Sequence, residues 1–171
     1  MTHPVPGPPT AAAATARAAT PHDAAEIARL RSDLILSEPL DTAWLATCRD
    51  QIAARLQPGG DARACVIDAP AGGLAACALA FIHPVLPAPN YPRGLAARIH
   101  AVATEPAHRH QGFARAALTA LLKCLEGEGV TLYELHTSEM AAPLYEQLGF
   151  RRDRALMRMT RIPPARPQTA S

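Results

Sequence analysis

The feature that most constrains this chain is an apolar stretch, Ala96 to Thr104, that leads through a short basic turn into a strongly periodic helix. Alternate positions of the stretch, Ile99, Ala101 and Ala103, form one row, as is typical of a strand, whereas the helix repeats at steps of three and four residues. A strand followed by an amphipathic helix predicts helices that pack on a central sheet. The apolar positions of the helix, which begins at Gly112 and stops at Gly127 and Gly129, are Ala114, Ala117, Leu118, Leu121, Leu122 and Leu125.

The remaining patterns predict the rest of one α+β domain, with a mixed order of strands and helices around that sheet. Two amphipathic helices follow a short first strand, and Asp41 caps the second helix. Two apolar runs separated by the turn residues 69–73 predict an antiparallel pair of strands. In chain order the expected elements are a strand at 15–20, a helix after Pro21, a helix from Asp41 to Pro58, strands at 63–68, 74–82 and 96–104, a helix from Gly112, a strand at 130–136, a helix at 141–148 and a strand at 155–160.

Length and composition narrow the class of protein. The 171 residues suit a single domain, predicted over 15–161, between proline-rich tails at 1–14 and 162–171 that are expected to be disordered. A net charge of +2 argues against nucleic acid or an anionic membrane as a partner. Neither a run of ~20 apolar residues nor a secretory leader is present. The four cysteines lack metal-site or disulfide spacing, which favours buried thiols and a cytoplasmic enzyme.

The turn between the strand at 96–104 and the helix has the composition of a phosphate site. It contains Arg109, one glycine at 112 and Arg115, with histidines between them. The free N–H groups of a helix start and the helix dipole both attract an anion, and glycine lets the backbone approach it. The sequence has neither a P-loop nor a G-x-G-x-x-G motif. An ordinary solvated basic surface remains an alternative for this turn.

Metal binding is not expected at this turn. His108 and His110 lie two residues apart near Glu105, but no cysteines at zinc-site spacing accompany them. The histidines are better explained as part of a solvated basic turn.

Two motifs in the correct order resemble those of the GCN5-related N-acetyltransferases, or GNAT family. Arg109-x-x-Gly112-x-Ala114 resembles the family's [RQ]-x-x-G-x-[GA] motif, and Pro106 precedes it. Residues 144–150, Leu-Tyr-Glu-Gln-Leu-Gly-Phe, resemble its terminal segment, one helix and one strand downstream. The resemblance covers about residues 15–160 and is strongest from 99 to 150.

The resemblance implies a GNAT-like fold and a cofactor site. The sheet would be mixed, mostly antiparallel and splayed between its fourth and fifth strands, with helices on both faces. Acetyl-CoA would be the co-substrate, and a primary amine of a small molecule would attack its thioester directly in a ternary complex. Ser138 stands where many relatives carry asparagine, and its hydroxyl reaches less far than an amide. The implied cofactor-binding residues are Val102, Ala103, Thr104, Arg109, His110, Gln111, Gly112, Phe113, Ala114, Arg115 and Ser138.

Acetyl transfer needs an acid for the departing thiolate and a base for the attacking amine. Tyr145 matches the tyrosine that serves as the acid in the family. His100 is the candidate base; its ordinary pKa near 6.5 suits the role, and alternation places it on the same side of its strand as Val102. A structural histidine, a water chain or Glu105 are the alternatives for the base. Thr137 and Ser138 lack the partners of a hydrolase triad and are not expected to be nucleophiles.

The acceptor is expected to bind near residues 34–44 and 83–93, because the family's specificity lies in the equivalent segments. Trp44 is expected to pack under the second helix, with stacking on the substrate as the alternative, while Glu38 and Asp41 can attract an ammonium group. In the second segment, four prolines hold Asn90, Tyr91 and Arg93 as a preformed rim.

The sequence leaves the identity of the acceptor open, and also the choice between a monomer and a homodimer. Two other classes of function remain as alternatives: a non-catalytic sensor or structural subunit that binds acyl-CoA, and an interaction domain whose basic turn binds nucleic acid.

Overall fold

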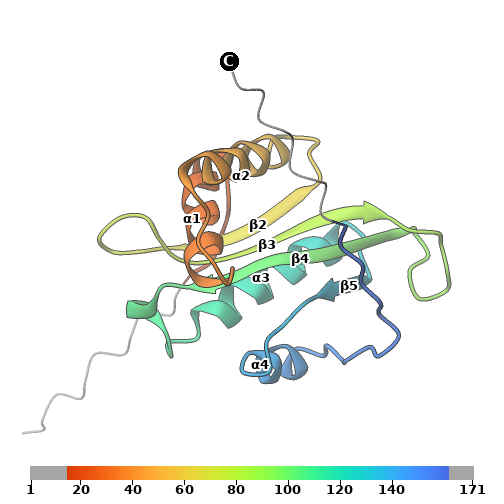
Figure 1. Cartoon of the computed structure of the whole chain (residues 1–171). Coiled ribbons are helices and arrows are strands. Elements are labelled where there is room, and N and C mark those ends of the chain that lie inside the picture. Colours follow the sequence, from red (N-terminus) through yellow and green to blue (C-terminus); the bar gives the residue numbers. More distant parts are fainter. Residues whose placement is uncertain (1–14, 162–171) are drawn as a thin grey trace, which may run out of the picture. The chain divides into compact units, whose positions relative to one another are not determined.

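A computed structural model describes residues 15–161 of the chain, which form two compact units divided between Thr137 and Ser138 (Figure 1). Each unit is described by itself. The tails predicted at 1–14 and 162–171 lie outside the described residues, and the prediction of one domain over 15–161 stays a prediction.

The first unit contains a five-stranded sheet in the order β1-β2-β3-β4-β5. The first three pairs are antiparallel, and β4 and β5 run parallel. The sheet is therefore mixed and mostly antiparallel, as the sequence predicted. The strands are β1 (Arg17–Ala18), β2 (Ala62–Asp68), β3 (Leu74–Pro84), β4 (Leu95–Thr104) and β5 (Leu132–Leu135).

The sheet opens between β4 and β5. The two strands pair only from Ala96 opposite Leu132 to Ile99 opposite Leu135. β4 then continues to Thr104 along β3 alone. This confirms the predicted splay between the fourth and fifth strands, and it leaves one edge of the last part of β4 without a neighbouring strand.

Helices cover both faces of the sheet (Figure 1). On one face, a 3-10 turn at Pro21–Asp23 leads into α1 (Ala24–Leu34), and α2 (Thr42–Arg55) follows. On the other face lies α3 (Phe113–Gly127). The many alanines of β3 and β4 let both layers approach closely, and each fully buried leucine of α3 stabilises the fold by about 1.5–3 kcal/mol. The buried side chains of α3 are Ala117, Leu118, Leu121 and Leu125.

Local signals placed α2 correctly. The Asp41 side chain accepts a hydrogen bond from the N–H of Trp44 at 2.8 Å, which confirms the predicted cap and is worth about 1 kcal/mol. The prediction of four buried thiols is only partly confirmed, since Cys65 and Cys77 are buried but Cys124 is exposed.

A bulge interrupts β4 at His100. Ala101 lies opposite Leu79 and Ile99 opposite Ala80, so His100 has no partner on β3. The extra residue places His100 and Ala101 on the same face of the sheet, against α1 and α2. The prediction that His100 shares a side with Val102 is therefore wrong, because strict alternation fails at the bulge.

The second unit contains the short helix α4 (Ala142–Gln147). The strand predicted at 155–160 is not formed, and these residues are exposed and irregular. A strand needs a partner for its backbone groups, and residues 138–161 contain no other strand. The Asp153 side chain instead accepts a hydrogen bond from the N–H of Ala155 at 2.8 Å, a local turn that competes with extended structure.

Candidate functional site

The turn after β4 adopts a left-handed backbone at two positions. A 3-10 turn at Pro106–His108 follows the strand, and then His110 has a φ of 61° and Gly112 a φ of 77°. This conformation is costly for a residue with a Cβ, by about 1–2 kcal/mol at His110. Left-handed residues next to right-handed ones turn successive N–H groups toward one side, a concavity that binds anions.

The start of α3 adds unsatisfied donors and positive charge. The first helical hydrogen bond joins the N–H of Ala116 to the carbonyl of Gly112, so the helix supplies no acceptor for the N–H groups before Ala116. The first helical turn of α3 contains no acidic residue, and it contains the basic residue Arg115. A cation at the positive end of a helix dipole is unfavourable alone and favourable with a bound anion.

Space for that anion lies at Gly112. A Cβ built on Gly112 would meet no protein atom within 4 Å. The glycine therefore leaves the N–H groups of the turn open, rather than making room for another part of the fold.

The free edge of β4 provides backbone groups beside the turn. The N–H of Glu105 donates to the carbonyl of Ala75 at 2.8 Å, and Thr104 lies opposite Ala76. In an antiparallel ladder this pattern directs the N–H and C=O of Thr104, and by alternation those of Val102, away from β3. Of the three predicted strand residues, Ala103 thus uses its backbone within the sheet. The buried Oγ1 of Thr104 also has no hydrogen-bond partner.

Two side chains of the turn fold back on it. The Nε of Arg109 lies 3.5 Å from the carbonyl oxygen of Thr104, and the His108 ring stacks on Phe113 with centroids 5.9 Å apart. His108 is thus engaged by an aromatic neighbour. Within residues 15–161 no group of three or more His, Cys, Asp and Glu side chains could hold a metal ion.

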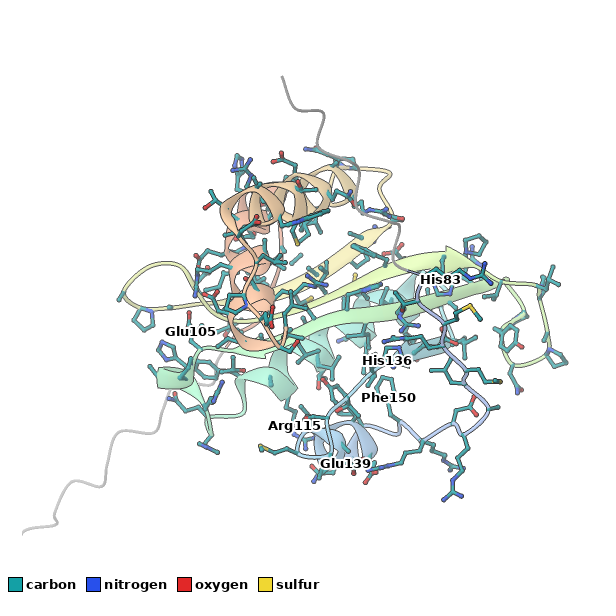
Figure 2. The ribbon with its side chains drawn as sticks, viewed as in Figure 1. His83, Glu105, Arg115, His136, Glu139 and Phe150 are labelled. Carbon is teal, nitrogen blue, oxygen red and sulfur yellow. The ribbon has the colours of Figure 1, made fainter. Side chains whose placement is uncertain are left out.

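Glu105, the alternative base, is part of an ion-pair network. Its carboxylate accepts a hydrogen bond from Arg29 of α1 at 2.5 Å. Arg29 also binds Glu26, whose pKa is held below its ordinary value mainly by that guanidinium. Glu26 in turn accepts from the N–H of Leu74. The network ties α1 to the start of β3 and to the end of β4, so Glu105 acts as a structural anchor. Figure 2 shows Glu105 beyond the end of β4, away from His83 at the other end of the strand pair.

His100, the candidate base, lies at the bulge and stays partly exposed. Its ring packs against Phe81 with centroids 4.7 Å apart. Burial lowers its pKa below the ordinary value, and nearby cations lower it further. The ring is therefore neutral at pH 7, which is the form that accepts a proton. The cations, which the sequence interpretation missed, are Arg31, Arg55 and Arg98, and His83 adds to their effect.

The segment around Tyr145 is a helix C-terminus closed by a Schellman motif. Gly149 has a φ of 98°, its N–H donates to the carbonyl of Glu146, and the N–H of Phe150 donates to the carbonyl of Tyr145 at 3.0 Å. The rings of Tyr145 and Phe150 meet edge-on at 5.9 Å. This apolar contact accompanies the motif in many helices, and it fixes the tyrosine ring. Tyr145 is buried, and burial raises its pKa above 10, so the phenol is protonated at neutral pH.

Ser138 has a local role at the start of this segment. Its Oγ accepts a hydrogen bond from the N–H of Ala141 at 3.3 Å, and its carbonyl accepts from the N–H of Ala142. The hydroxyl thus helps to begin α4. Ser138 and Tyr145 belong to the second unit, and the turn and His100 to the first.

The structure places three parts of the expected acceptor segments. Trp44 is 64% exposed, so it does not pack under α2, and the core of that helix begins at Leu45. Asp41 caps the helix through one of its carboxylate oxygens, and its attraction for an ammonium group stays a prediction. The loop before β4 is docked on the turn that follows α3, since the carbonyl of Asn90 accepts from Thr131 at 2.7 Å and Arg93 lies over Gly129. The loop lies at the opposite end of β4 from Thr104, and the rim of Asn90, Tyr91 and Arg93 stays a prediction.

Comparisons with known proteins agree on one family. A family model described as an acetyltransferase (GNAT) domain matches residues 44–152. A GCN5-related N-acetyltransferase from Ralstonia eutropha JMP134 has a similar structure, with a TM-score of 0.70 and 22% identity over 85% of this chain and 97% of that chain. A predicted acetyltransferase from Clostridium acetobutylicum, solved with acetyl-CoA, has a TM-score of 0.74 and 17% identity over 85% and 95% of the two chains.

A glucosamine-6-phosphate N-acetyltransferase from Arabidopsis thaliana also has a similar structure, with a TM-score of 0.64 and 18% identity over 86% of this chain and 97% of that chain. At these identities the likenesses show the fold. No curated protein sequence matches the chain. Across residues 15–161, none of the helices is long and apolar enough to cross a membrane.

Proposed function

Because this chain belongs to the GNAT family of acetyltransferases, we propose that it transfers the acetyl group of acetyl-CoA to a primary amine of a small molecule. The names of two structural neighbours, the N-acetyltransferases from Ralstonia eutropha and Arabidopsis thaliana, support an amine acceptor. The neighbour solved with acetyl-CoA supports the co-substrate.

The residues of the turn and of the β4 edge suit acetyl-CoA. The N–H groups at the start of α3 would hold the pyrophosphate, with Gly112 giving access and the two arginines of the turn, Arg109 and Arg115, adding charge. Val102 and Thr104 would pair their free backbone groups with the amides of the pantetheine arm, as in an added strand. Gln111 and Phe113 would contribute to this site only through their backbone N–H groups.

Acetyl transfer to an amine requires two proton transfers, which side chains of this protein would carry out. Bound acetyl-CoA supplies an activated acyl group as its thioester. Neutral His100 takes a proton from the acceptor ammonium or amine, and protonated Tyr145 donates its proton toward the departing sulfur. The directions of both pKa shifts support this assignment, since each group is in the required form at pH 7.

The observation that carries the proposal is the open space at Gly112, at the start of α3, beside the part of β4 that β5 does not pair with. The test is release of free thiol from acetyl-CoA in the presence of a panel of primary amines. We expect amine-dependent release and saturable binding of CoA to the full chain. Binding without release for any amine would instead support a non-catalytic acyl-CoA sensor, and absence of both would reject the proposal.

The pH dependence of the reaction provides a second prediction. The active form needs neutral His100, so kcat/KM should fall as the pH drops through the His100 pKa, which lies below its ordinary value of 6.5. The raised pKa of Tyr145 places its loss of a proton above pH 10. Rate profiles between pH 5 and 9 for the wild type and His100→Gln would check this. The variant should lose the fall in kcat/KM at low pH. The same fall in both proteins would show that another group is the base.

A further inference from the structure

Basic side chains gather around the bulge in β4, on the face of the sheet covered by α1 and α2. They are Arg31, Arg55, His83, Arg98 and His100. After burial, the largest effects on the His100 pKa come from the other members, which all lower it by repulsion. Each of the other four residues is therefore close enough to His100 to act on its charge. We call these five residues the basic cluster.

The sheet and α2 arrange three of these residues around Phe81. Arg98 lies directly opposite Phe81 in the β3–β4 register, and the His100 ring packs on the Phe81 ring. The Arg55 guanidinium lies over the same ring, with its central carbon 4.8 Å from the centroid. Phe81 is therefore the common neighbour of three basic side chains that come from different elements.

The remaining two residues share this face. Arg31 follows Ile27 by one turn of α1, and Ile27 is fully buried in the core on this face. His83 follows Phe81 by two residues along β3, and alternate residues of a strand point to the same face.

Among the described residues, carboxylates balance the basic cluster only in part: Glu134 of β5 lies opposite Arg98 in the parallel register but forms no ion pair with it. Arg55 pairs with Asp61 at 2.6 Å. In the described part of the chain, the side chains of Arg31 and Arg98 form no hydrogen bond or ion pair. The dipole of α1 favours a cation in its last turn and accounts for Arg31, and the cross-strand position of Glu134 favours a cation at Arg98 without an ion pair between them. Unpaired, partly buried cations that repel one another are stabilised by a bound anion.

The position of the basic cluster matches the acceptor side of the opened sheet. β5 leaves β4 after Ile99, one residue before the bulge. The turn proposed to bind the pyrophosphate leads into α3, which covers the opposite face. An acceptor must therefore approach His100 from the face that carries the cluster.

We propose that the acceptor amine carries an anionic group, a phosphate or a carboxylate, that binds to Arg31 and Arg98 beside the bulge. The inference rests on the proposed acetyltransferase function and names the class of its acceptor. A planar guanidinium binds either anion through two parallel hydrogen bonds. The positive charge of the basic cluster disfavours acceptors with a second cationic group, such as diamines. The bound anion also offsets the repulsion on His100 and raises its pKa.

The test compares amines that differ only in the anionic group. Thiol release from acetyl-CoA is measured with 2-aminoethyl phosphate against ethanolamine, and with β-alanine against β-alaninamide. We expect kcat/KM to favour the anionic member of at least one pair by about tenfold or more, and the pair that shows the preference distinguishes phosphate from carboxylate. Equal use of both members in both pairs would overturn the inference while leaving the acetyltransferase function intact.

Variants of the basic cluster test which residues cause the preference for an anionic amine. Arg98→Gln and Arg31→Gln should lower the preference toward one, mainly through the KM of the anionic amine. Arg49→Gln is the matched control, because Arg49 lies on the solvent side of α2 and pairs with Asp50. A preference that survives in both cluster variants would contradict the assignment.

A direct binding measurement distinguishes failure of the proposed anion site from failure of the proposed acetyltransferase function. Calorimetry with 2-aminoethyl phosphate and with β-alanine on CoA-saturated protein measures binding of these probes to the basic cluster, and it requires no acetyl transfer. Binding of either probe that is lost in Arg98→Gln and kept in Arg49→Gln would support the inference even if no amine releases thiol. Absence of binding by both probes to the wild type would overturn it. The His100 ring signal in NMR titrations should show a higher pKa with bound probe.

Discussion

Replacing Gly112 with alanine is expected to raise the KM for acetyl-CoA by about ten- to a hundredfold, with little change in kcat at saturation. The new Cβ meets no protein atom, but it projects where the pyrophosphate would contact the N–H groups of α3. Loss of one or more hydrogen bonds to a charged group costs about 1.5–3 kcal/mol, which corresponds to this range. Steady-state kinetics and calorimetry with CoA measure the effect.

Gly72→Ala is the matched control for that variant. Gly72 has a φ of 98° and also has no protein atom near a built Cβ, but it lies in the turn between β2 and β3. Both variants should lose about 1–2 kcal/mol of stability from left-handed strain. Only Gly112→Ala should weaken CoA binding. Equal CoA affinity in the two variants would reject the proposal that this turn binds the pyrophosphate.

Replacing Tyr145 with phenylalanine is expected to lower kcat by about a hundredfold or more, with the KM for acetyl-CoA nearly unchanged. The phenol is the proposed proton donor, and the buried ring keeps its volume and its edge-on contact with Phe150. The Schellman motif involves only backbone groups of Tyr145, so the local fold should persist. Single-turnover thiol release, together with CoA binding, separates loss of chemistry from loss of binding.

Tyr133→Phe provides the comparison for Tyr145→Phe. Burial also raises the pKa of Tyr133, but its hydroxyl donates to the carbonyl of Val130 at 2.7 Å in the first unit. This variant should lose about 1 kcal/mol of stability and keep its kcat. An unchanged kcat in Tyr145→Phe would reject the acid role, and an equal fall in both variants would indicate a structural cause.

Local patterns in the sequence predicted most of the elements. The period of the helix after Gly112, the cap at Asp41 and the turn chemistry at 69–73 each depend on near neighbours, and the structure confirms all three. The basic turn with its glycine, between a strand and a helix, was also visible as a sequence pattern, and its role in binding an anion stays a prediction.

Features that depend on distant partners were not predictable. The strand expected at 155–160 had a suitable composition, but a strand exists only where another strand pairs with it. Trp44 looked like a core residue from its type alone. The polar pair Arg98 and His100, two positions apart in an apolar strand, was a signal for a shared face. The contribution of Arg31 and Arg55 to that face required the packing of α1 and α2.

The bulge at His100 has a consequence for how β4 can vary. Before it, even-numbered residues such as Arg98 face α1 and α2; after it, odd-numbered residues such as Ala101 and Ala103 do so. The half of the strand before the bulge and the half after it therefore follow opposite alternations of their side chains. Substitutions in either half leave the other's side chains in place, whereas deletion of one residue other than His100 would exchange the faces of an entire half.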